Sequence, residues 1–465
     1  MTKAEAIALE EYRRAHVPLY NDQKLKLGVF GINCSYGLNI SHAPTTYKVS
    51  WEHTSAIVKR ADAMGFELAL PVARWRGFGG TTDFNGESFE TYTWAAGLAQ
   101  ATKNIMVAAT SHVPTVHPIV AAKQAVTIDH ISNGRFALNL VMGWFTPEME
   151  MFHGSQRAHD DRYRYGADWL KVAKRLWTEE EPFDFDSEHF HIKQAQAHPK
   201  PIQKPHPVLI NAGHSPAGMD FTAREVDFSF VGFDSVEAVK NVAARVRDKA
   251  RTDYKREIGV CTSALVVCRE TEAEARQVYR SIIEHGDWVA ADNLMKVLGI
   301  ESQSFNDRIQ KYRERYVAGW GTNPIIGTPE QVTEQLAQVS AAGVDGMVFG
   351  FLDYNRLQLG AACVLSDSGT IAEESTMLGF PAVTLRSSIE RPEALDTGAI
   401  TMTDLVPEAV LRGVRFARSR AERAPEGANR GGERPADYSI LNTSERVVNL
   451  ILSTAFQHEF WTGLR

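Results

Sequence analysis

Cysteine is scarce in this sequence, and a long uninterrupted apolar run is missing. The four cysteines lie far apart and form no CxxC pair, so we expect neither a zinc site nor a disulfide framework, and a reducing cytoplasm is the expected compartment. No stretch approaches the roughly 20 apolar residues that a membrane-spanning helix needs. The polar N-terminus mixes acids with its bases and does not look like a secretory signal. We therefore expect no membrane segment.

An excess of positive charge is also absent. Lysine and arginine number 50 against 57 acidic residues, a net charge of -7, so no overall field favours a nucleic-acid partner. The sequence contains no Walker, G-x-S-x-G or HExxH motif, which excludes the common signatures of NTPases, serine hydrolases and zinc proteases. A chain of 465 residues with 44% hydrophobic residues is instead typical of a globular protein with two or three domains, or one large barrel plus an appendage.

Eight short β-rich runs alternate with helical segments over the first three quarters of the chain. They span residues 25–32, 66–72, 105–110, 136–141, 207–212, 227–233, 258–267 and 346–352. This alternation predicts parallel βαβ units, and eight is the number that closes a TIM (β/α)8 barrel. An open doubly wound sheet is the alternative. Two longer stretches interrupt the pattern, 178–206 and 284–326, the second carrying Trp288 and Trp320. We expect each stretch to form a lid or a subunit contact. For the first stretch, a surface loop without such a role is the alternative.

The chain changes character after residue 355. Residues 361–417 restart with a strand, a Ser-Asp-Ser-Gly turn, a helix and a second strand at 381–385, whereas 417–437 is rich in arginine, glycine and proline and predicts a loop. A final amphipathic helix is expected after Asn442. We therefore predict an N-terminal extension (1–24), an α/β barrel domain (25–355) and a C-terminal α/β appendage (361–465), with the boundary at 353–361.

Polar side chains stand at the ends of three predicted strands. Thr110 closes one, Asn139 interrupts the apolar run FALNLV, and Asn211 precedes the turn Gly213–Gly218. In a barrel, polar residues at the carboxyl ends of strands are more often functional than structural. A buried asparagine that satisfies itself within the core is the alternative for Asn139, and threonine is common in strands.

Further polar residues predict a binding rim around the same end. The turn 213–218 lies between a strand and a helix, a geometry that holds phosphate through backbone N–H groups, although an ordinary capped turn has the same pattern. Arg162, Tyr163 and Arg164 can supply charge to that phosphate, or they can belong to a solvated helix start. A loop with Arg74, Arg76 and three glycines is either a substrate rim or a flexible turn. His112 and His117 are candidate acids or bases, with a structural role as the alternative.

Taken in order, several of these segments resemble one family. They are RGFGG at 76–80, VTIDHISNGRFALNLVMGWFTPE at 126–148, DDRYRYGADW at 160–169 and PVLINAGHSPAGMDF at 207–221. Together they look like the bacterial luciferase-like flavin monooxygenases. RGFGG and the NLV-x-GW block are most similar to the pyrimidine monooxygenases, while AAKQAVTIDH, HDDRYR and PKPIQKPHP also resemble the dimethylsulfone type.

The resemblance implies a TIM barrel that binds reduced FMN at its C-terminal face and uses O2 as co-substrate. A separate NADH- or NADPH-dependent reductase would supply the flavin. By matching positions, Thr110 and Asn139 correspond to the pair proposed to hold dioxygen. The implied flavin contacts are Ala73, Arg74, Asn139, Glu148, Arg162, Tyr163 and Ser215. Because residues 73 and 74 differ from the pyrimidine type, the contact there is expected to be partly through the backbone.

Residues 361–465 resemble a different family, the C-terminal half of the non-hydrolysing UDP-N-acetylglucosamine 2-epimerases. VLSDSGTIAEES at 364–375, Gly379-Phe-Pro381 and IERPEALDTG at 389–398 carry the similarity. It implies that Ser368, Gly369 and Thr370 face UDP phosphates, that Glu374 faces the ribose, and that Arg391 lies at the nucleotide cleft. The epimerase's N-terminal catalytic domain has no counterpart here, so we expect a fusion with a partial GT-B (Rossmann-like) half and no epimerase activity.

These observations together predict an FMNH2-dependent monooxygenase of a two-component system, acting on a small nitrogen- or sulfur-containing compound. An F420-dependent oxidoreductase of the same fold is the alternative within enzymes. An inactive flavin- or nucleotide-binding relic is the alternative outside them. The resemblance further implies a homo-oligomer, a dimer or a tetramer, without nucleic-acid or membrane partners. Substrate choice is expected to lie in the loops 75–86 and 284–326.

Overall fold

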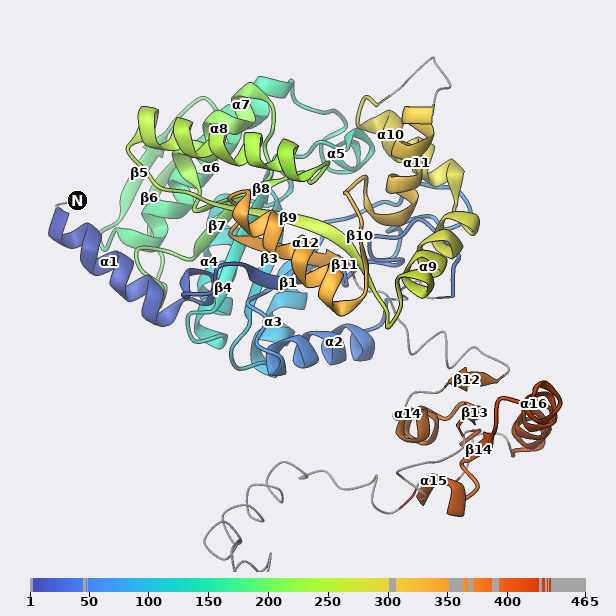
Figure 1. Ribbon diagram of the computed structural model, residues 1–465. Coiled ribbons are helices and arrows are strands. Elements are labelled where there is room, and N and C mark those ends of the chain that lie inside the picture. Colours follow the sequence, from blue (N-terminus) through green and yellow to red (C-terminus); the bar gives the residue numbers. More distant parts are fainter. Residues whose placement is uncertain are drawn as a thin grey trace, which may run out of the picture. The chain divides into compact units, whose positions relative to one another are not determined.

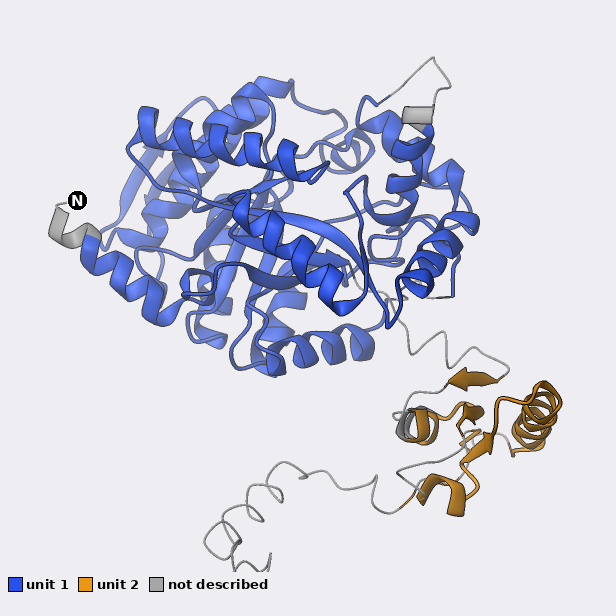
Figure 2. Ribbon diagram, viewed as in Figure 1, with its two compact units in different colours: residues 1–352 blue, residues 353–465 orange. Residues whose placement is uncertain are grey.

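A computed structural model describes residues 3–44, 47, 49–300, 307–350, 363–366, 371–386, 393–425, 429–430, 433 and 435. The chain forms two compact units, residues 1–352 and 353–465, which Figure 2 distinguishes by colour.

Eight parallel strands of the first unit close into a barrel. They are β1 (Lys26–Phe30), β2 (Leu68–Leu70), β3 (Met106–His112), β4 (Phe136–Val141), β7 (Val208–Asn211), β8 (Phe228–Val231), β9 (Gly259–Cys268) and β11 (Gly346–Gly350). The ladder runs in that order, and β11 pairs with β1 to complete it. All eight predicted strands are confirmed, and the closure decides for the TIM barrel against an open sheet.

Helices surround the barrel, as Figure 1 shows. They are α2 (Trp51–Ala63), α3 (Thr91–Ala101), α4 (Pro118–Ile131), α5 (Thr146–His153), α6 (His159–Thr178), α7 (Pro216–Glu225), α8 (Val236–Tyr254), α9 (Glu272–Glu284) and α12 (Pro329–Ala341). The local sequence determines where several of these helices begin. Ser235 caps α8, and Thr271 and Thr328 form the predicted capping boxes of α9 and α12.

Strand alternation divides the apolar residues between two cores. One face of each strand packs against the helices, while the other fills the barrel interior with residues such as Leu70, Met106 and Ile210. The N-terminal segment closes this interior at the end where the strands begin. After α1 (Lys3–His16), Val17 and Leu19 join the interior cluster, and Arg13 pairs with Asp227 at 2.9 Å.

The two long stretches take different paths over the barrel. Residues 178–206 form the hairpin β5 (Phe183–Asp186) and β6 (His191–Ala195), then run to Ile202, whose N–H bonds to Asp129 where α4 leads into the start of β4. Residues 284–326 form α10 (Trp288–Val297), α11 (Asp307–Gly319) and β10 (Ile325–Gly327). The N–H of Ile40, in the segment after β1, bonds to the Val317 carbonyl of α11. The first stretch thus runs along the outside of the helices, where the Phe190 ring centre lies 5.8 Å from that of His117 at the start of α4, whereas the second packs on the segment that follows β1.

The second unit is a small parallel α/β layer. Its sheet order is β12 (Val364–Ser366), β13 (Ala382–Leu385) and β14 (Ile400–Thr403), with α14 (Ile371–Leu378), α15 (Glu393–Asp396) and α16 (Pro407–Glu422). The predicted strand–helix–strand order is confirmed. The loop predicted from residue 417 is wrong for its first part, because α16 continues to Glu422 and buries Ala417 and Ala421. Ser368, Gly369, Thr370, Arg391 and the helix predicted after Asn442 lie outside the described residues.

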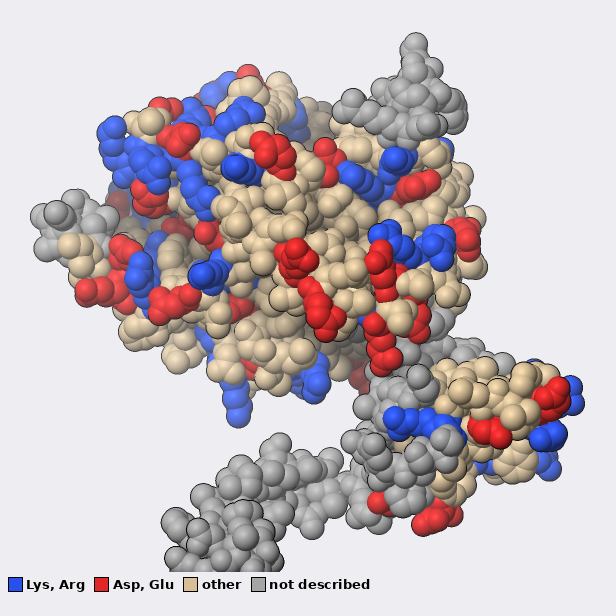
Figure 3. All heavy atoms as spheres, in the orientation of Figure 1, with Lys and Arg blue, Asp and Glu red and all other residues tan. Residues whose placement is uncertain are grey.

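Charged side chains of both signs are interspersed on the face of the molecule drawn in Figure 3. This agrees with the near balance of basic and acidic residues in the sequence. None of the described helices is both long and apolar enough to cross a membrane.

Candidate functional site

Thr110 and Asn139 meet at the carboxyl end of the barrel. They are direct register partners on β3 and β4, and the Asn139 amide donates to Thr110 Oγ1 at 3.1 Å. Thr110 in turn donates to the Pro71 carbonyl at 2.6 Å, which fixes the hydroxyl. Asn139 Oδ1 is buried and has no hydrogen-bond partner among the described residues. The buried Asn39 and Asn85 likewise leave Oδ1 without a partner among the described residues, so Asn139 is set apart by its place at the end of a barrel strand beside Thr110.

A buried charge cluster lies next to this pair. The Arg74 guanidinium, directly beyond β2, is 3.4 Å from Glu148 Oε1 at the start of α5, with side-chain exposures of 2% and 0%. The same oxygen accepts the backbone N–H groups of Trp75 and Arg76 at 2.6 and 3.2 Å. Glu148 Oε2 faces His112 Nε2 at 3.7 Å. Glu148 thus fixes the loop after β2 against β3 and α5.

Burial controls the protonation of this cluster. It lowers the pKa of His112 to about 3, with the positive charge of Arg74 acting in the same direction, so the imidazole is neutral near pH 7. Burial also lowers the pKa of the Arg74 guanidinium, while Glu148 opposes that shift. His112 Nδ1 and Arg74 Nε are buried without hydrogen-bond partners in the described part of the chain. A cavity of about 20 Å³ lined in part by Thr110, His112 and Arg74 adjoins these groups.

Aromatic rings enclose the Arg74 guanidinium. Its carbon lies 4.7 Å from the ring centre of Phe78, 5.5 Å from Trp144 and 5.9 Å from Trp320. Phe78 belongs to the RGFGG loop, Trp144 follows β4 and Trp320 follows α11, so three separate segments build this wall. Rings around a buried cation stabilise it and exclude water.

The turn after β7 is held by Asn211. Asn211 Oδ1 accepts from the Gly213 N–H at 2.9 Å and from the Thr222 hydroxyl at 2.7 Å, and its amide donates to the Leu140 carbonyl. Asn211 is therefore fully used in positioning the turn. Ser215 caps α7 by accepting from the Gly218 N–H at 3.1 Å.

Tyr163 joins the Ser215 turn from α6. Its hydroxyl lies where a side chain on Gly218 would clash, at 2.6 Å from an added Cβ. Burial raises the Tyr163 pKa, while a hydrogen bond with Ser215 and the nearby Arg162 oppose the shift. Arg162 donates to the Gly143 carbonyl at 3.0 Å and keeps a buried Nε without a partner among the described residues. The structure thus brings Arg162, Tyr163 and Ser215 together.

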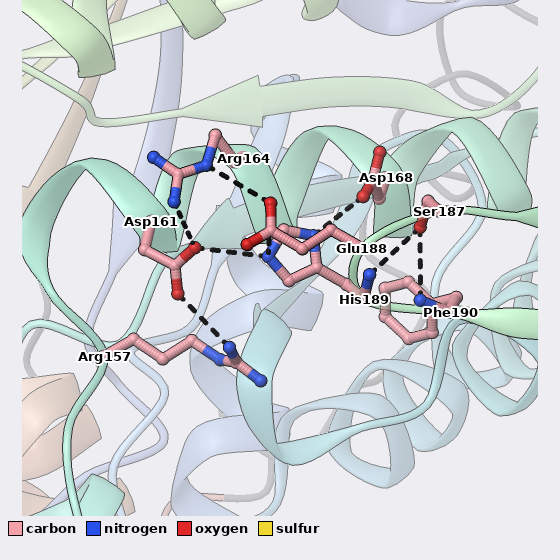
Figure 4. A network of polar contacts seen from close by, with 8 residues as sticks. All are labelled: Arg157, Asp161, Arg164, Asp168, Ser187, Glu188, His189 and Phe190. Carbon is pink, nitrogen blue, oxygen red and sulfur yellow. Dashed lines mark hydrogen bonds and ion pairs between the residues drawn. The ribbon is translucent and has the colours of Figure 1, made fainter.

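Arg164 belongs to a different network, which Figure 4 shows. It pairs with Asp161 at 2.8 Å and approaches Glu188 at 3.7 Å, while His189 contacts Asp161 and Asp168 with its two ring nitrogens. Arg164 therefore does not reach the Ser215 turn. Asp161, Glu188 and His189 have metal-ligating spacing, but Arg164 already neutralises the two acids. The network ties the β5–β6 hairpin to α6.

The remaining predicted residues take simpler places. Ala73 is buried beside Arg74. His117 caps α4 by accepting the Ile119 N–H at 3.3 Å, which agrees with the structural role that was the alternative to acid–base chemistry. Sequence patterns did not indicate Asp287, whose carboxylate accepts from the Thr82 N–H, the Thr82 hydroxyl and the Thr81 hydroxyl at 2.7, 2.9 and 3.2 Å. Asp287 also caps α10, so it joins the RGFGG loop to the segment above the barrel. The only feature of the local sequence that could have indicated Asp287 is its position directly before α10, where aspartate is a common helix cap.

Two family models match the chain. Residues 30–346 match the luciferase-like monooxygenase model, and residues 328–452 match the UDP-N-acetylglucosamine 2-epimerase model. Residues 328–346, which contain α12 and the start of β11, fall in both matches.

Curated relatives cover the barrel unit. The chain is 33% identical to pyrimidine monooxygenase RutA of Acinetobacter baylyi over 71% of this chain and 90% of that one. It is 32% identical to the FMNH2-dependent dimethylsulfone monooxygenase of Pseudomonas putida over 72% and 92%. The solved structure of DmoA from Hyphomicrobium sulfonivorans matches with a TM-score of 0.62 and 16% identity, over 88% of this chain and 93% of that one. At that identity the structural match shows the fold alone.

Proposed function

The chain belongs to the luciferase-like monooxygenase family, and from this premise we propose that it is a two-component enzyme that uses reduced FMN to insert one oxygen atom into a small nitrogen- or sulfur-containing compound. The observation that carries the proposal is the group of buried polar atoms without partners at the carboxyl ends of the strands. Among the described residues these atoms include Arg74 Nε, His112 Nδ1, Asn139 Oδ1, Glu148 Oε2 and Arg162 Nε. Each costs about 1–3 kcal/mol unless a ligand satisfies it.

These residues fit a flavin mononucleotide. Ser215, Tyr163 and Arg162, with the N–H groups at the start of α7, offer hydrogen-bond donors and a positive charge to a phosphate. Ala73, Arg74 and Glu148 would contact the polar ring system of the flavin through backbone and side-chain atoms. When bound, reduced FMN supplies the electrons that activate dioxygen.

Thr110 and Asn139 are proposed to orient dioxygen. The adjoining cavity of about 20 Å³ has room for one small molecule. The Thr110 hydroxyl donates to Pro71 and accepts one N–H of the Asn139 amide, which leaves the second amide N–H of Asn139 as a fixed donor for developing negative charge. Aromatic side chains around Arg74 exclude water from the same space.

The first test is an anaerobic titration with reduced FMN, followed by rapid mixing with oxygen. We expect the wild type to bind the flavin and to reoxidise it in two resolved phases. N139A should keep the Kd for reduced FMN within about threefold but lose the slow phase. S215A should raise that Kd about tenfold, the effect of one charge-assisted hydrogen bond. N241A, on the exposed face of α8, is the matched asparagine control.

Oxygen transfer is then measured directly. Uracil and dimethylsulfone are the first trial substrates, because the two relatives are named for a pyrimidine and for dimethylsulfone. The products are analysed by mass spectrometry after reaction with 18O2. The separate reductase, the oligomeric state and the cytoplasmic location are further parts of this proposal. The proposal would be contradicted if the protein transferred hydride to F420 without taking up oxygen. It would also be contradicted if the protein bound neither reduced FMN nor F420.

We assign no epimerase activity to the second unit. Its match begins at residue 328, and the residues before it form the barrel rather than a sugar-nucleotide domain. Conversion of UDP-N-acetylglucosamine by the purified chain would contradict this assignment.

A further inference from the structure

Trp320 occupies a costly backbone position at the end of α11. Its φ is +58° and that of Gly321 is +76°, in the left-handed region that bulky residues rarely adopt. A side chain at Gly321 would come within 2.7 Å of the Tyr316 ring, so glycine is required there. The chain therefore makes a sharp corner that turns the Trp320 indole, and such strain is typical of functional positions.

The indole N–H has nothing to bond to. Trp320 Nε1 is buried and has no hydrogen-bond partner among the described residues. A buried tryptophan N–H usually finds an acceptor, and the other large buried indoles follow that rule: those of Trp94, Trp169 and Trp177 donate to Thr54, Val116 and Ala122. The unsatisfied donor of Trp320 therefore calls for an acceptor other than the described residues, which a bound compound can supply.

Trp320 lies between two spaces at the carboxyl end of the barrel. On one side are the Phe78 and Trp144 rings at 6.3 and 6.4 Å, with the Arg74 guanidinium at 5.9 Å. On the other is a cavity of about 310 Å³ that His214 and Thr322 also line. The polar atoms that Trp320 and Arg74 leave without partners are both donors, so this wall is suited to a compound with an acceptor oxygen and an apolar or planar body.

We propose that Trp320 is a specificity-determining residue whose indole N–H donates to a carbonyl or sulfonyl oxygen of the substrate. The inference rests on the proposed function. The residues proposed for the flavin come from the strand ends of the barrel and from α5, α6 and α7, whereas Trp320 comes from the segment 284–326 added above them. In barrels of one scaffold, such added loops are where substrate recognition varies.

The test uses the full chain with matched probe pairs. Uracil is compared with pyrimidine, and dimethylsulfone with dimethyl sulfide, because each pair keeps the body and removes the acceptor oxygens. Binding is followed by the fluorine NMR spectrum of protein carrying 5-fluorotryptophan, in which W320F identifies the Trp320 signal. The nine tryptophans make such an assignment practical. W288F, in the same segment with its ring under Arg313, is the control.

We expect at least one oxygen-bearing probe to shift the Trp320 signal and to bind about five- to tenfold more tightly than its counterpart, the effect of one hydrogen bond. W320F should lose that preference while its Kd for reduced FMN stays within twofold, and W288F should behave as wild type. Should W320F fail to fold, W320Y takes its place.

Three results would overturn the proposal. They are a preference that W320F retains, a wild type without preference in either pair, and a Kd for reduced FMN at least tenfold weaker in W320F. The last would assign Trp320 to the flavin. A wild type that prefers the oxygen-bearing probe but binds no flavin would contradict the proposed function and leave the role of Trp320 intact.

Discussion

At the scale of single residues, the ion pair of Arg74 and Glu148 has consequences that a surface pair would not have. Both side chains are withdrawn from water, so removing one charge leaves the other unpaired at a cost of about 3–5 kcal/mol. E148Q keeps the shape and one acceptor for the Trp75 and Arg76 N–H groups but loses the charge. We expect it to lower the free energy of unfolding by that amount in chemical denaturation.

The double variant R74M/E148Q serves as the control for this prediction. Methionine replaces the cation with an apolar chain that the surrounding rings of Phe78 and Trp144 accommodate. We expect it to recover more than half of the stability lost in E148Q. A single variant that loses less than 1 kcal/mol would show that the guanidinium has another counter-charge or reaches water.

His112 makes stability depend on pH. Its pKa is about 3 in the folded chain against a usual 6.5, so below pH 6.5 the unfolded chain takes up a proton that the folded chain refuses. Stability is thus fully present above pH 6.5 and falls as the pH decreases toward 3, by at most ~1.4 kcal/mol per unit. H112Q lacks this group. Relative to H112Q, wild type should lose about 2 kcal/mol between pH 7 and 5, and a pH-independent difference would contradict the assigned burial.

At the scale of elements, Asp287 connects the end of the RGFGG loop with α10, beside Asn293, whose amide donates to the Phe78 carbonyl at 2.8 Å. D287A removes three hydrogen bonds from Thr81 and Thr82 and the cap of α10. We expect a loss of about 2–3 kcal/mol and faster amide hydrogen exchange confined to residues 78–86 and 287–297, measured by mass spectrometry.

Asp292 provides the matched control on the same helix. Its carboxylate is exposed and pairs with Arg313 at 2.8 Å, so D292A should cost less than 1 kcal/mol. Exchange that rises in D287A equally throughout the barrel would mean that Asp287 supports global stability and does not specifically join the two segments.

Elements also show what the sequence could predict. The eight strands and the caps at Ser235, Thr271 and Thr328 were predictable because each depends on residues within a few positions. The pairing of Thr110 with Asn139 was implied only by the family resemblance, and the register of β3 and β4 places the two residues opposite each other. Contacts across long separations did not follow: Asp287 meets Thr82 across 205 residues, and Trp320 meets Phe78 from another segment.

The error in the second unit has a similar cause. Residues 417–422 contain arginines and few large apolar side chains, which favoured a loop. Helix α16 nevertheless continues there, because it needs only the small buried faces of Ala417 and Ala421. The apolar pattern of a helix that packs through alanines is too weak for periodicity to detect.

At the scale of the whole molecule, the two units differ in how complete they are. In the first, every strand of the barrel has two neighbours, and β11 pairs with both β1 and β9. In the second, a three-stranded sheet leaves several large apolar side chains exposed, among them Leu405 at 78%, Phe416 at 57% and Leu411 at 55%. Exposed apolar groups on a small unit indicate an interaction surface or a tendency to associate.

This difference predicts the effect of removing the second unit. A chain that ends after residue 362 keeps both neighbours of β11 and all proposed flavin contacts. We expect its midpoint of thermal unfolding, followed by circular dichroism, to stay within about 3 °C of the full chain, the shift that less than 1 kcal/mol produces in a domain of this size. Its Kd for reduced FMN should stay within twofold. If the shortened chain instead loses cooperative unfolding, the barrel needs residues beyond 362, and the two units would form one folding entity despite their matches to separate families.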